Sequence, residues 1–256
     1  MNSMPIYSYP SVRSIIVTKL LKGNLNNILQ VMDEIIEEND SSVLRELNSI
    51  LSRPEYLSML IQLVRNNPEF LEKMQRESYY HENGFHKIVL LEGKNFKLRI
   101  HQFGSSAKIP MENIHDHRWP FASSILYGQL KMDLFELAED YLNAEKLYHF
   151  IYNSNKQGGS YSTSLKGVTY LKKIQTRNYS CGDNYLMLPQ ELHRIKNQPG
   201  DESITLILTG KPQGVLCNLY AKRKILEQEK IQKQYSQELL WKMLDQIIEF
   251  IYPQKN

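Results

Sequence analysis

The hydrophobic pattern of this chain changes its period near Tyr79. Before that point apolar residues recur at three- and four-residue steps, as at Ile28, Met32 and Ile36, which is the period of an amphipathic helix. After it, apolar residues alternate or run in short blocks between Gly, Pro, Asn and Ser, which favours short strands joined by turns. The order of these patterns predicts helices followed by an antiparallel β-sandwich or a small barrel.

The first 80 residues are expected to be helical. Gly23-Asn24 marks the end of one helix and the start of the next. Two shorter amphipathic segments follow, 42–51 and 54–65, and Pro68 is placed to open another helix. This region can cap the barrel or form a homodimer interface, and both possibilities remain open.

The strand pattern extends to about residue 222. Turn residues at 92–95 divide the segment 86–103 into a β-hairpin. A polar stretch rich in Ser and Gly, 138–166, is expected to hold a short helix and an excursion loop. The remaining predicted strands are 121–127, 129–136, 167–177, 184–188, 193–196, 203–209 and 215–221.

Helical periodicity returns from Arg223. The apolar stripe on this last segment consists of Leu239, Leu240, Met243, Leu244, Ile247, Ile248 and Ile251. The stripe predicts a C-terminal helix packed against the barrel or the N-terminal helices. We therefore divide the chain into a helical N-terminal region (1–80), a β-barrel (81–222) and a C-terminal helix (223–256). The predicted fold class is mainly β with α additions.

Composition narrows the classes of function. The net charge of +3 is spread among mixed charges, so binding to nucleic acid or to a membrane surface is not favoured. The apolar runs are too short to cross a bilayer, and no secretion signal is recognisable at the N-terminus. Cys181 and Cys217 are too few for a disulfide framework. These features predict a cytoplasmic protein.

Two short segments bring histidines into one pattern. His115 and His117 are one residue apart, and on an extended segment such residues project from the same side. His193, on a later predicted strand, could complete one face of a metal's coordination sphere. Three imidazoles leave coordination positions open, which distinguishes a catalytic metal site from a closed structural one.

The same residues resemble the cupin superfamily. His115-x-His117 followed by Gly128 is similar to the first cupin signature. The residues similar to the second signature are Gly182, Asp183, Pro189, His193 and Asn197. The resemblance covers roughly residues 86–212, and it implies a double-stranded antiparallel β-barrel whose histidines bind a metal in the barrel mouth.

Two segments further resemble the thiol dioxygenase branch, of which cysteine dioxygenase is the best-known member. They are the run NFKLRI from Asn95 to Ile100 and the run LHRIKN from Leu192 to Asn197. This branch uses three neutral histidines, and Phe121 and Ala122 here stand where most cupins place a glutamate ligand. The resemblance therefore implies Fe(II), while Zn, Ni or Mn stays open because imidazole suits all of them.

Other positions depart from that branch. His86 falls where cysteine dioxygenases hold the substrate carboxylate with an arginine. The family's serine-histidine-tyrosine relay corresponds to Thr205, Ile207 and Thr209, and an isoleucine cannot relay a proton. These differences argue against cysteine as the substrate.

Several side chains are candidates for the substrate pocket. Arg118 follows the second histidine and has the planar fork that matches a carboxylate, although strand alternation can also point it away from a metal. His86 and Tyr170 are further pocket candidates. His101 can support a metal ligand through its second ring nitrogen or can be a core residue.

The leading hypothesis is a mononuclear non-haem Fe(II) oxygenase, dioxygenase-like, in which His115, His117 and His193 hold the metal. Its partners would be molecular oxygen and a small polar, amino-acid-like metabolite. Two other classes remain open: a metal-dependent cupin acting as isomerase, hydrolase or lyase, and a cupin that binds a ligand without catalysis.

Overall fold

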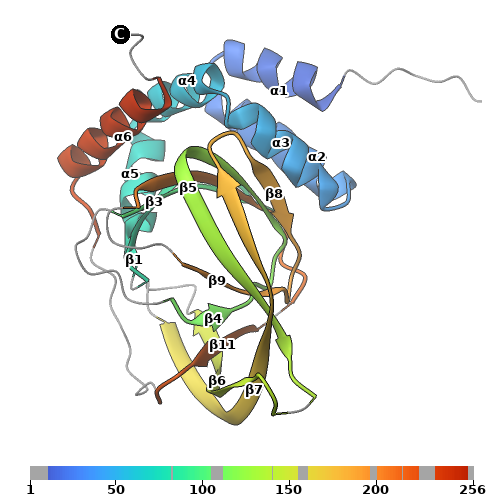
Figure 1. The fold of residues 1–256 in the computed structure, drawn as a ribbon. Coiled ribbons are helices and arrows are strands. Elements are labelled where there is room, and N and C mark those ends of the chain that lie inside the picture. Colours follow the sequence, from blue (N-terminus) through green and yellow to red (C-terminus); the bar gives the residue numbers. More distant parts are fainter. Residues whose placement is uncertain are drawn as a thin grey trace, which may run out of the picture.

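The structure is a computed structural model, and it describes residues 11–81, 83–104, 112–139, 141–154, 161–196, 201–214, 216–224 and 234–252. Helices lie across one face of a β-structure whose strands are antiparallel throughout, and the strands extend away from the helices as a barrel (Figure 1). The predicted fold class, mainly antiparallel β with α additions, is confirmed. Asn197, part of the second cupin-like signature, lies outside the described residues.

The N-terminal region forms five helices within its described residues: α1 (Val12–Leu21), α2 (Leu25–Glu38), α3 (Ser42–Leu51), α4 (Pro54–Arg65) and α5 (Pro68–Glu77). Their boundaries follow local capping signals. Gly23 has a positive φ of 66°, and the Asn24 side chain accepts a hydrogen bond from the backbone N of Asn27 at 3.1 Å. Pro68 occupies the first turn of α5. The predicted helix starts and ends are confirmed here.

Six strands make the sheet that faces the helices, in the order β1-β2-β3-β10-β5-β8. They are β1 (Tyr79–His81), β2 (Phe85–Glu92), β3 (Lys97–Phe103), β10 (Ser203–Thr209), the N-terminal half of β5 (Phe121–Leu137) and β8 (Asn184–Met187). The predicted hairpin is β2–β3. Its turn is fixed by Asp33 of α2, whose carboxylate accepts from the backbone N of Lys94 and Asn95 at 2.9 and 2.8 Å.

The second sheet closes on itself in the order β5-β7-β6-β11-β4-β9-β5. It contains the C-terminal half of β5 with β7 (Tyr161–Ser180), β6 (Glu145–Ser154), β11 (Cys217–Ala221), β4 (Ile114–His115) and β9 (Leu192–Ile195). β4 lies between β11 and β9, and β9 lies between β4 and β5, so residues that are far apart in the sequence are neighbours there.

Gly128 lies where β5 passes from one sheet to the other. Its φ is 71°, and a Cβ at this position would lie 2.0 Å from the carbonyl oxygen of Glu202. Only glycine satisfies both conditions. The two predicted strands 121–127 and 129–136 are consequently one continuous strand with a glycine at its turning point.

The expectation for residues 138–166 is wrong. The structure shows β6 at Glu145–Ser154 and the beginning of β7 at Tyr161, where a helix and a loop were predicted. Leu147 and Phe150 are buried between the strands of the second sheet. The Ser and Gly residues near the tip of this long hairpin hid the strand pattern.

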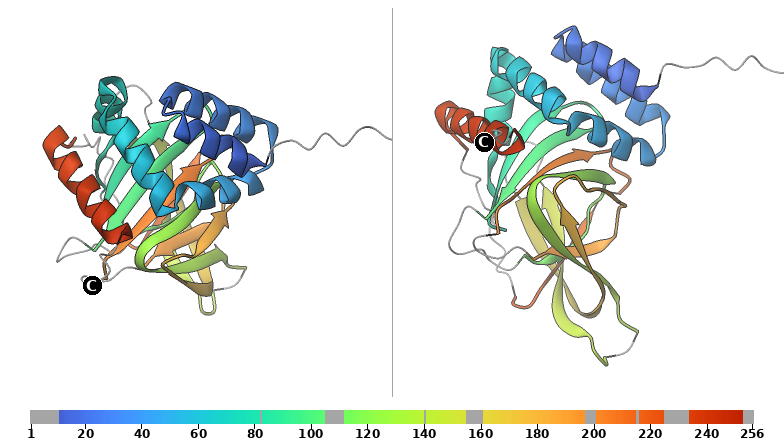
Figure 2. Two further views of the ribbon diagram at one scale, coloured as in Figure 1. Left: turned by 90° about the horizontal axis from the view of Figure 1, so that it is seen from above. Right: turned by 45° about the horizontal axis from the view of Figure 1, so that its top comes forward.

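The helices pack on the outer face of the first sheet, and Figure 2 shows them side by side over its strands. Ile88, Ile100 and Leu206 from three neighbouring strands join the apolar faces of the helices in one core. The C-terminal helix α6 (Gln237–Ile251) contacts α4, α5 and β5, so it packs on both the helices and the barrel. No helix in the described part of the chain is long and apolar enough to cross a membrane.

A second apolar cluster lies on the inner face of the barrel. Its buried members are Phe85, Phe103, Phe121, Ile125, Leu130, Met132, Leu134, Tyr185 and Met187. The two faces of the first sheet therefore have different partners: the outer face packs on helices, and the inner face looks toward β4 and β9.

Candidate metal centre

The three predicted histidines meet at the junction of β4 and β9. His115 and His193 are directly opposite each other in the β4–β9 register, and His117 follows just beyond the end of β4. The ring centroids of these three histidines are 4.5, 4.9 and 5.2 Å apart. One ligand nitrogen from each ring lies within 4.8 Å of the others. Positions 115 and 117 thus face one point, as their spacing predicts.

Backbone carbonyls fix the tautomer of two of these rings. Nδ1 of His115 lies 3.0 Å from the carbonyl oxygen of Asn113, and Nδ1 of His193 lies 3.0 Å from that of Glu191. A carbonyl can only accept, so Nδ1 carries the proton and donates it in each neutral ring. Nε2 is then left with a lone pair that can bind a metal, which is the arrangement common among metal-binding histidines.

Burial disfavours the charged form of two of these imidazoles. Loss of solvation, together with repulsion from the neighbouring His115, lowers the pKa of His193 to about 3. Burial likewise holds the pKa of His117 well below its usual range, with added repulsion from His115 and His193. Metal binding requires the neutral form of histidine, so His117 and His193 need not release protons at neutral pH.

The lowered pKa of His193 makes the stability of the metal-free protein depend on pH. Between the usual value of 6.5 and the folded value of about 3, the unfolded chain binds a proton that the folded chain does not. Stability is therefore lost as the pH falls through this window, by about 1.4 kcal/mol per pH unit from this residue. Urea unfolding of metal-free protein at pH 6.5, 5.5 and 4.5 measures the slope. We expect His193→Asn to show a shallower slope by that amount, and equal slopes would contradict this account.

Hydrogen bonds from Asn218 and from Gln190 hold the segment 115–117 in place. The buried carboxylate of Asp116, between the two histidines, accepts from the backbone N and from the side-chain Nδ2 of Asn218, each at 2.6 Å. The carbonyl oxygen of His117 accepts from the backbone N of Gln190 at 3.2 Å. Gln190 has a positive φ of 68°, which is uncommon for a residue with a side chain. Its turn joins the loop before His193 to the segment that carries His117.

Aromatic side chains form the wall beside the histidines. The ring of Phe121 packs edge-on against His117, with ring centroids 5.0 Å apart. The indole of Trp119 stacks on His117 with ring centroids 5.9 Å apart. Within the described part of the chain, the cluster of possible metal ligands consists of the three histidines alone. The residues present fit a metal with three neutral nitrogen ligands and open positions.

The three predicted pocket residues lie in different places. Arg118 is next to the centre, with its guanidinium 5.0 Å from the ring centre of Trp119. His86 is on the opposite face of β2 from the barrel interior, where its Nδ1 is 2.6 Å from the Tyr235 hydroxyl. Strand alternation therefore excludes His86 from the pocket.

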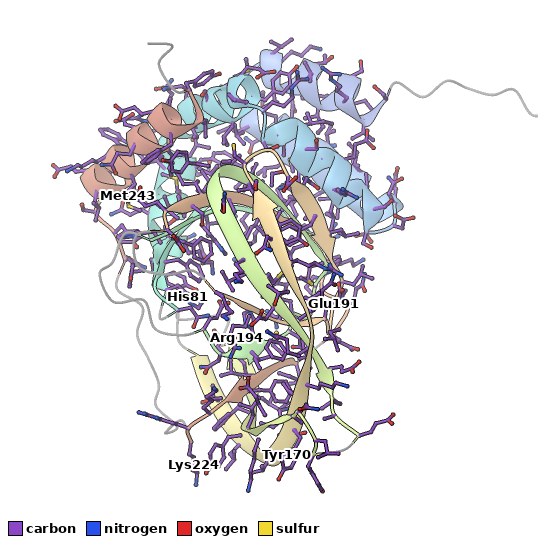
Figure 3. The ribbon with its side chains drawn as sticks, viewed as in Figure 1. His81, Tyr170, Glu191, Arg194, Lys224 and Met243 are labelled. Atoms are coloured by element: carbon purple, nitrogen blue, oxygen red, sulfur yellow. The ribbon has the colours of Figure 1, made fainter. Side chains whose placement is uncertain are left out.

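Tyr170 lies far from the histidines. It stacks on Tyr141 with ring centroids 4.4 Å apart, and Figure 3 places it at the end of the barrel remote from the helices. The position lies on the long β6–β7 hairpin, which extends beyond β4 and β9. The assignment of Tyr170 to the pocket is not supported by this placement.

Thr205, Ile207 and Thr209 share the inner face of β10, because they alternate along one strand. The Thr209 hydroxyl is engaged by the backbone N of Lys97 at 2.9 Å, so it is bound to β3 and not to the histidine cluster.

Three residues near the centre, Lys87, Arg99 and His81, were not among the predicted site residues. Lys87 and Arg99 lie on the inner face of β2 and β3. The rings of His81 and His101 both contact Phe85, with ring centroids 4.5 and 4.6 Å from it. Burial, together with repulsion from Lys87 and then from His115, lowers the pKa of His81 to about 3, so this residue lies near the three histidines. Figure 3 shows His81 at mid-height of the molecule, between the level of the helices and that of Tyr170.

No family profile and no curated protein sequence matches this chain. Among solved structures, hydroquinone 1,2-dioxygenase from a Sphingomonas species matches at 8% identity over 57% of this chain and 74% of its own, with a TM-score of 0.33. A Klebsiella pneumoniae protein with a double-stranded β-helix domain matches at 12% identity over 59% and 95%, with a TM-score of 0.31. Hydroxypropylphosphonic acid epoxidase from S. wedmorenis matches at 10% identity over 77% and 95%, also with a TM-score of 0.31. Such distant likenesses identify neither a family nor an activity.

Proposed function

We propose that His115, His117 and His193 hold one Fe(II) ion and that the protein is a mononuclear non-haem iron oxygenase acting on a small polar molecule. The observation that carries this proposal is the convergence of three imidazoles, whose ligand nitrogens lie within 4.8 Å of one another inside a barrel. A ligand set without a carboxylate leaves the ion its full charge and leaves coordination positions for other groups.

The residues around such a centre would have two roles, to hold the ion and to shield it from water. The three imidazoles hold the ion through Nε2, with two of them oriented by the carbonyls of Asn113 and Glu191. Trp119 and Phe121 cover the face of His117 and exclude water there. When bound, Fe(II) supplies the redox chemistry that joins molecular oxygen to a chelated substrate.

Oxygen consumption tests the proposal. Protein loaded anaerobically with one equivalent of Fe(II) is transferred to aerated buffer, and oxygen uptake is recorded with panels of hydroxy acids, amino acids and thiols. We expect uptake with at least one class, above the rate of free Fe(II) and of the His193→Ala variant. Full iron content without uptake on any panel would count against an oxygenase.

A hydrolase, isomerase or lyase is the second candidate, because a site of three histidines is also used by catalytic zinc. Elemental analysis of protein purified without added metal separates the two, since stoichiometric zinc with no response to oxygen favours this candidate. In either case we propose a cytoplasmic location, which agrees with the two free cysteines, Cys181 and Cys217.

A further inference from the structure

We propose that Arg99 and Lys87 form an oxyanion-binding subsite beside the histidines, and that the substrate is a small organic anion of the dicarboxylate class. The inference rests on the proposed function, because it assigns the substrate of the same centre. Three observations support it: the two side chains point into the barrel, ring contacts link Arg99 to His117, and neither side chain forms an ion pair among the described residues.

Both cations are on the inner face of the barrel. In the β2–β3 register Lys87 is opposite His101 and Val89 is opposite Arg99, so Lys87 and Arg99 are diagonal neighbours on one face. That face also carries Phe85 and continues into the inner apolar cluster. The helices cover the other face, so these charges point away from the helices and toward β4 and β9.

A chain of ring contacts joins Arg99 to the metal ligands. Its guanidinium carbon is 5.5 Å from the ring centre of Trp119, and the same indole stacks on His117 at 5.9 Å. Arg118 approaches that indole at 5.0 Å, which adds a further positive charge to this side of the cluster. An anionic group held by Arg99 would therefore lie on the Trp119 side of His117.

Neither cation has an ion pair among the described residues. The Nε of Arg99 is buried without a hydrogen-bond partner, and the Nζ of Lys87 donates to the Tyr79 hydroxyl at 2.9 Å. The nearest acids, Glu77 and Glu92, are paired with Lys97 at 3.2 and 2.6 Å. Enclosing two like charges without a counter-ion is unfavourable, and an anionic ligand offsets that cost.

Other polar atoms near the two basic side chains also lack a hydrogen-bond partner. They are His101 Nε2, Trp119 Nε1 and Thr205 Oγ1, all of them buried. Thr205 is opposite His101 across β3 and β10, and His101 is opposite Lys87. Buried polar groups are rarely left unpaired in a folded protein, so a cluster of them on one face marks a place where water or a ligand binds.

The acids close to the histidines are already engaged. Both oxygens of Asp116 accept from Asn218, and both oxygens of Glu112 accept, from the side chain of Asn83 and from the backbone N of Ile195. The Glu191 carboxylate accepts from the backbone N of Leu188. None of these described carboxylates forms an ion pair with Arg99 or Lys87, so the oxyanion of a ligand can take that place.

Calorimetric titration of the full chain with succinate tests the subsite. β-Alanine, which replaces one carboxylate by an ammonium group, and neutral succinamide serve as matched ligands. We expect succinate to bind more tightly than either, and Arg99→Met to weaken succinate by roughly 10- to 100-fold, as the loss of charge-assisted hydrogen bonds predicts. Lys87→Met should weaken it independently, and Arg99→Lys should retain part of the affinity.

The control variant is Arg53→Met. The guanidinium of Arg53 also lies over an aromatic ring, that of Tyr56 at 5.7 Å, but Arg53 is exposed just before α4. Its replacement therefore removes a charge and a cation–π contact of the same kind at a site far from the proposed subsite. Equal succinate affinity in Arg99→Met, Lys87→Met and Arg53→Met overturns the subsite, as does tighter binding of β-alanine than of succinate.

The titration is made on metal-free and on metal-loaded protein, and metal content is measured separately. Succinate binding that depends on Arg99 in protein unable to bind metal supports the subsite while it refutes the proposed function. Stoichiometric metal together with Arg99-independent binding refutes the subsite alone.

Discussion

Replacement of His117 by alanine is expected to reduce metal affinity by at least about 100-fold and to abolish metal-dependent activity, while the fold is retained. The loss follows from the removal of one of three ligands, which leaves two imidazoles and no carboxylate in reach to replace it. His117 is the informative choice because it lies just beyond the end of β4, whereas His115 and His193 form a cross-strand pair.

His86→Ala is the matched control for this substitution. It also removes a histidine from the barrel domain, but the side chain faces the helices and contacts Tyr235. We expect this variant to bind one metal ion per chain, as we also expect of the unsubstituted protein. Metal content by elemental analysis, with circular dichroism to verify folding, gives the comparison. Stoichiometric metal in folded His117→Ala protein would mean that other residues hold the ion.

Replacement of Asp116 by alanine is expected to have the second-largest effect, this time on stability as well as on metal binding. Asp116 is 3% exposed, and its two oxygens accept two hydrogen bonds from Asn218, each of 2.6 Å. The substitution leaves two partly buried donors of Asn218 unpaired, at a cost of about 1–3 kcal/mol. It also frees the segment between the two histidines, so metal affinity should fall by roughly 10- to 100-fold.

Urea unfolding of the metal-free protein measures the first effect, and competition with a chelator measures the second. Asp201→Ala removes an exposed carboxylate near the same barrel and should change neither quantity. Asp116→Asn keeps the size of the side chain and one acceptor oxygen. Its free energy of unfolding and its metal affinity are expected to lie between those of the unsubstituted protein and those of Asp116→Ala. If Asp116→Ala matched Asp201→Ala in both measurements, Asp116 would have no positioning role.

The helices and the histidine cluster could be predicted because their signals are local. Gly23, Asn24 and Pro68 are capping signals that act within one helical turn. Two histidines one residue apart on an extended segment face the same side whatever the rest of the fold does. The third ligand, His193, needed the family resemblance, because its pairing with β4 spans nearly 80 residues of sequence.

The inward direction of the polar residues of β2 and β3 could not be predicted. It depends on which face of each strand packs against the helices. In the segment containing Arg99 and His101, polar residues alternate with Leu98 and Ile100, which is also the pattern of a strand with one face in solvent. Only the packing of helices on Leu98 and Ile100 turns the polar face inward. The same alternation, applied to β2, places His86 outside and Lys87 inside.

The β6–β7 hairpin shows a second limit. Its strands pair mainly with each other and with β5 and β11, and its composition near the tip is that of a loop. Long-range pairing, which the sequence pattern does not encode locally, determines that these residues extend as strands. Tyr170 was therefore assigned to a strand correctly, but its distance from the histidines was not foreseen.

The central claim is that one metal ion is bound by the Nε2 atoms of three histidines. Anomalous scattering from a crystal of protein loaded with one equivalent of Fe(II) measures this directly. We expect one peak at about 2.0–2.2 Å from Nε2 of His115, His117 and His193, with Nδ1 of His115 and His193 still bonded to backbone carbonyls. No peak between these rings, or a peak coordinated through other residues, would contradict the claim.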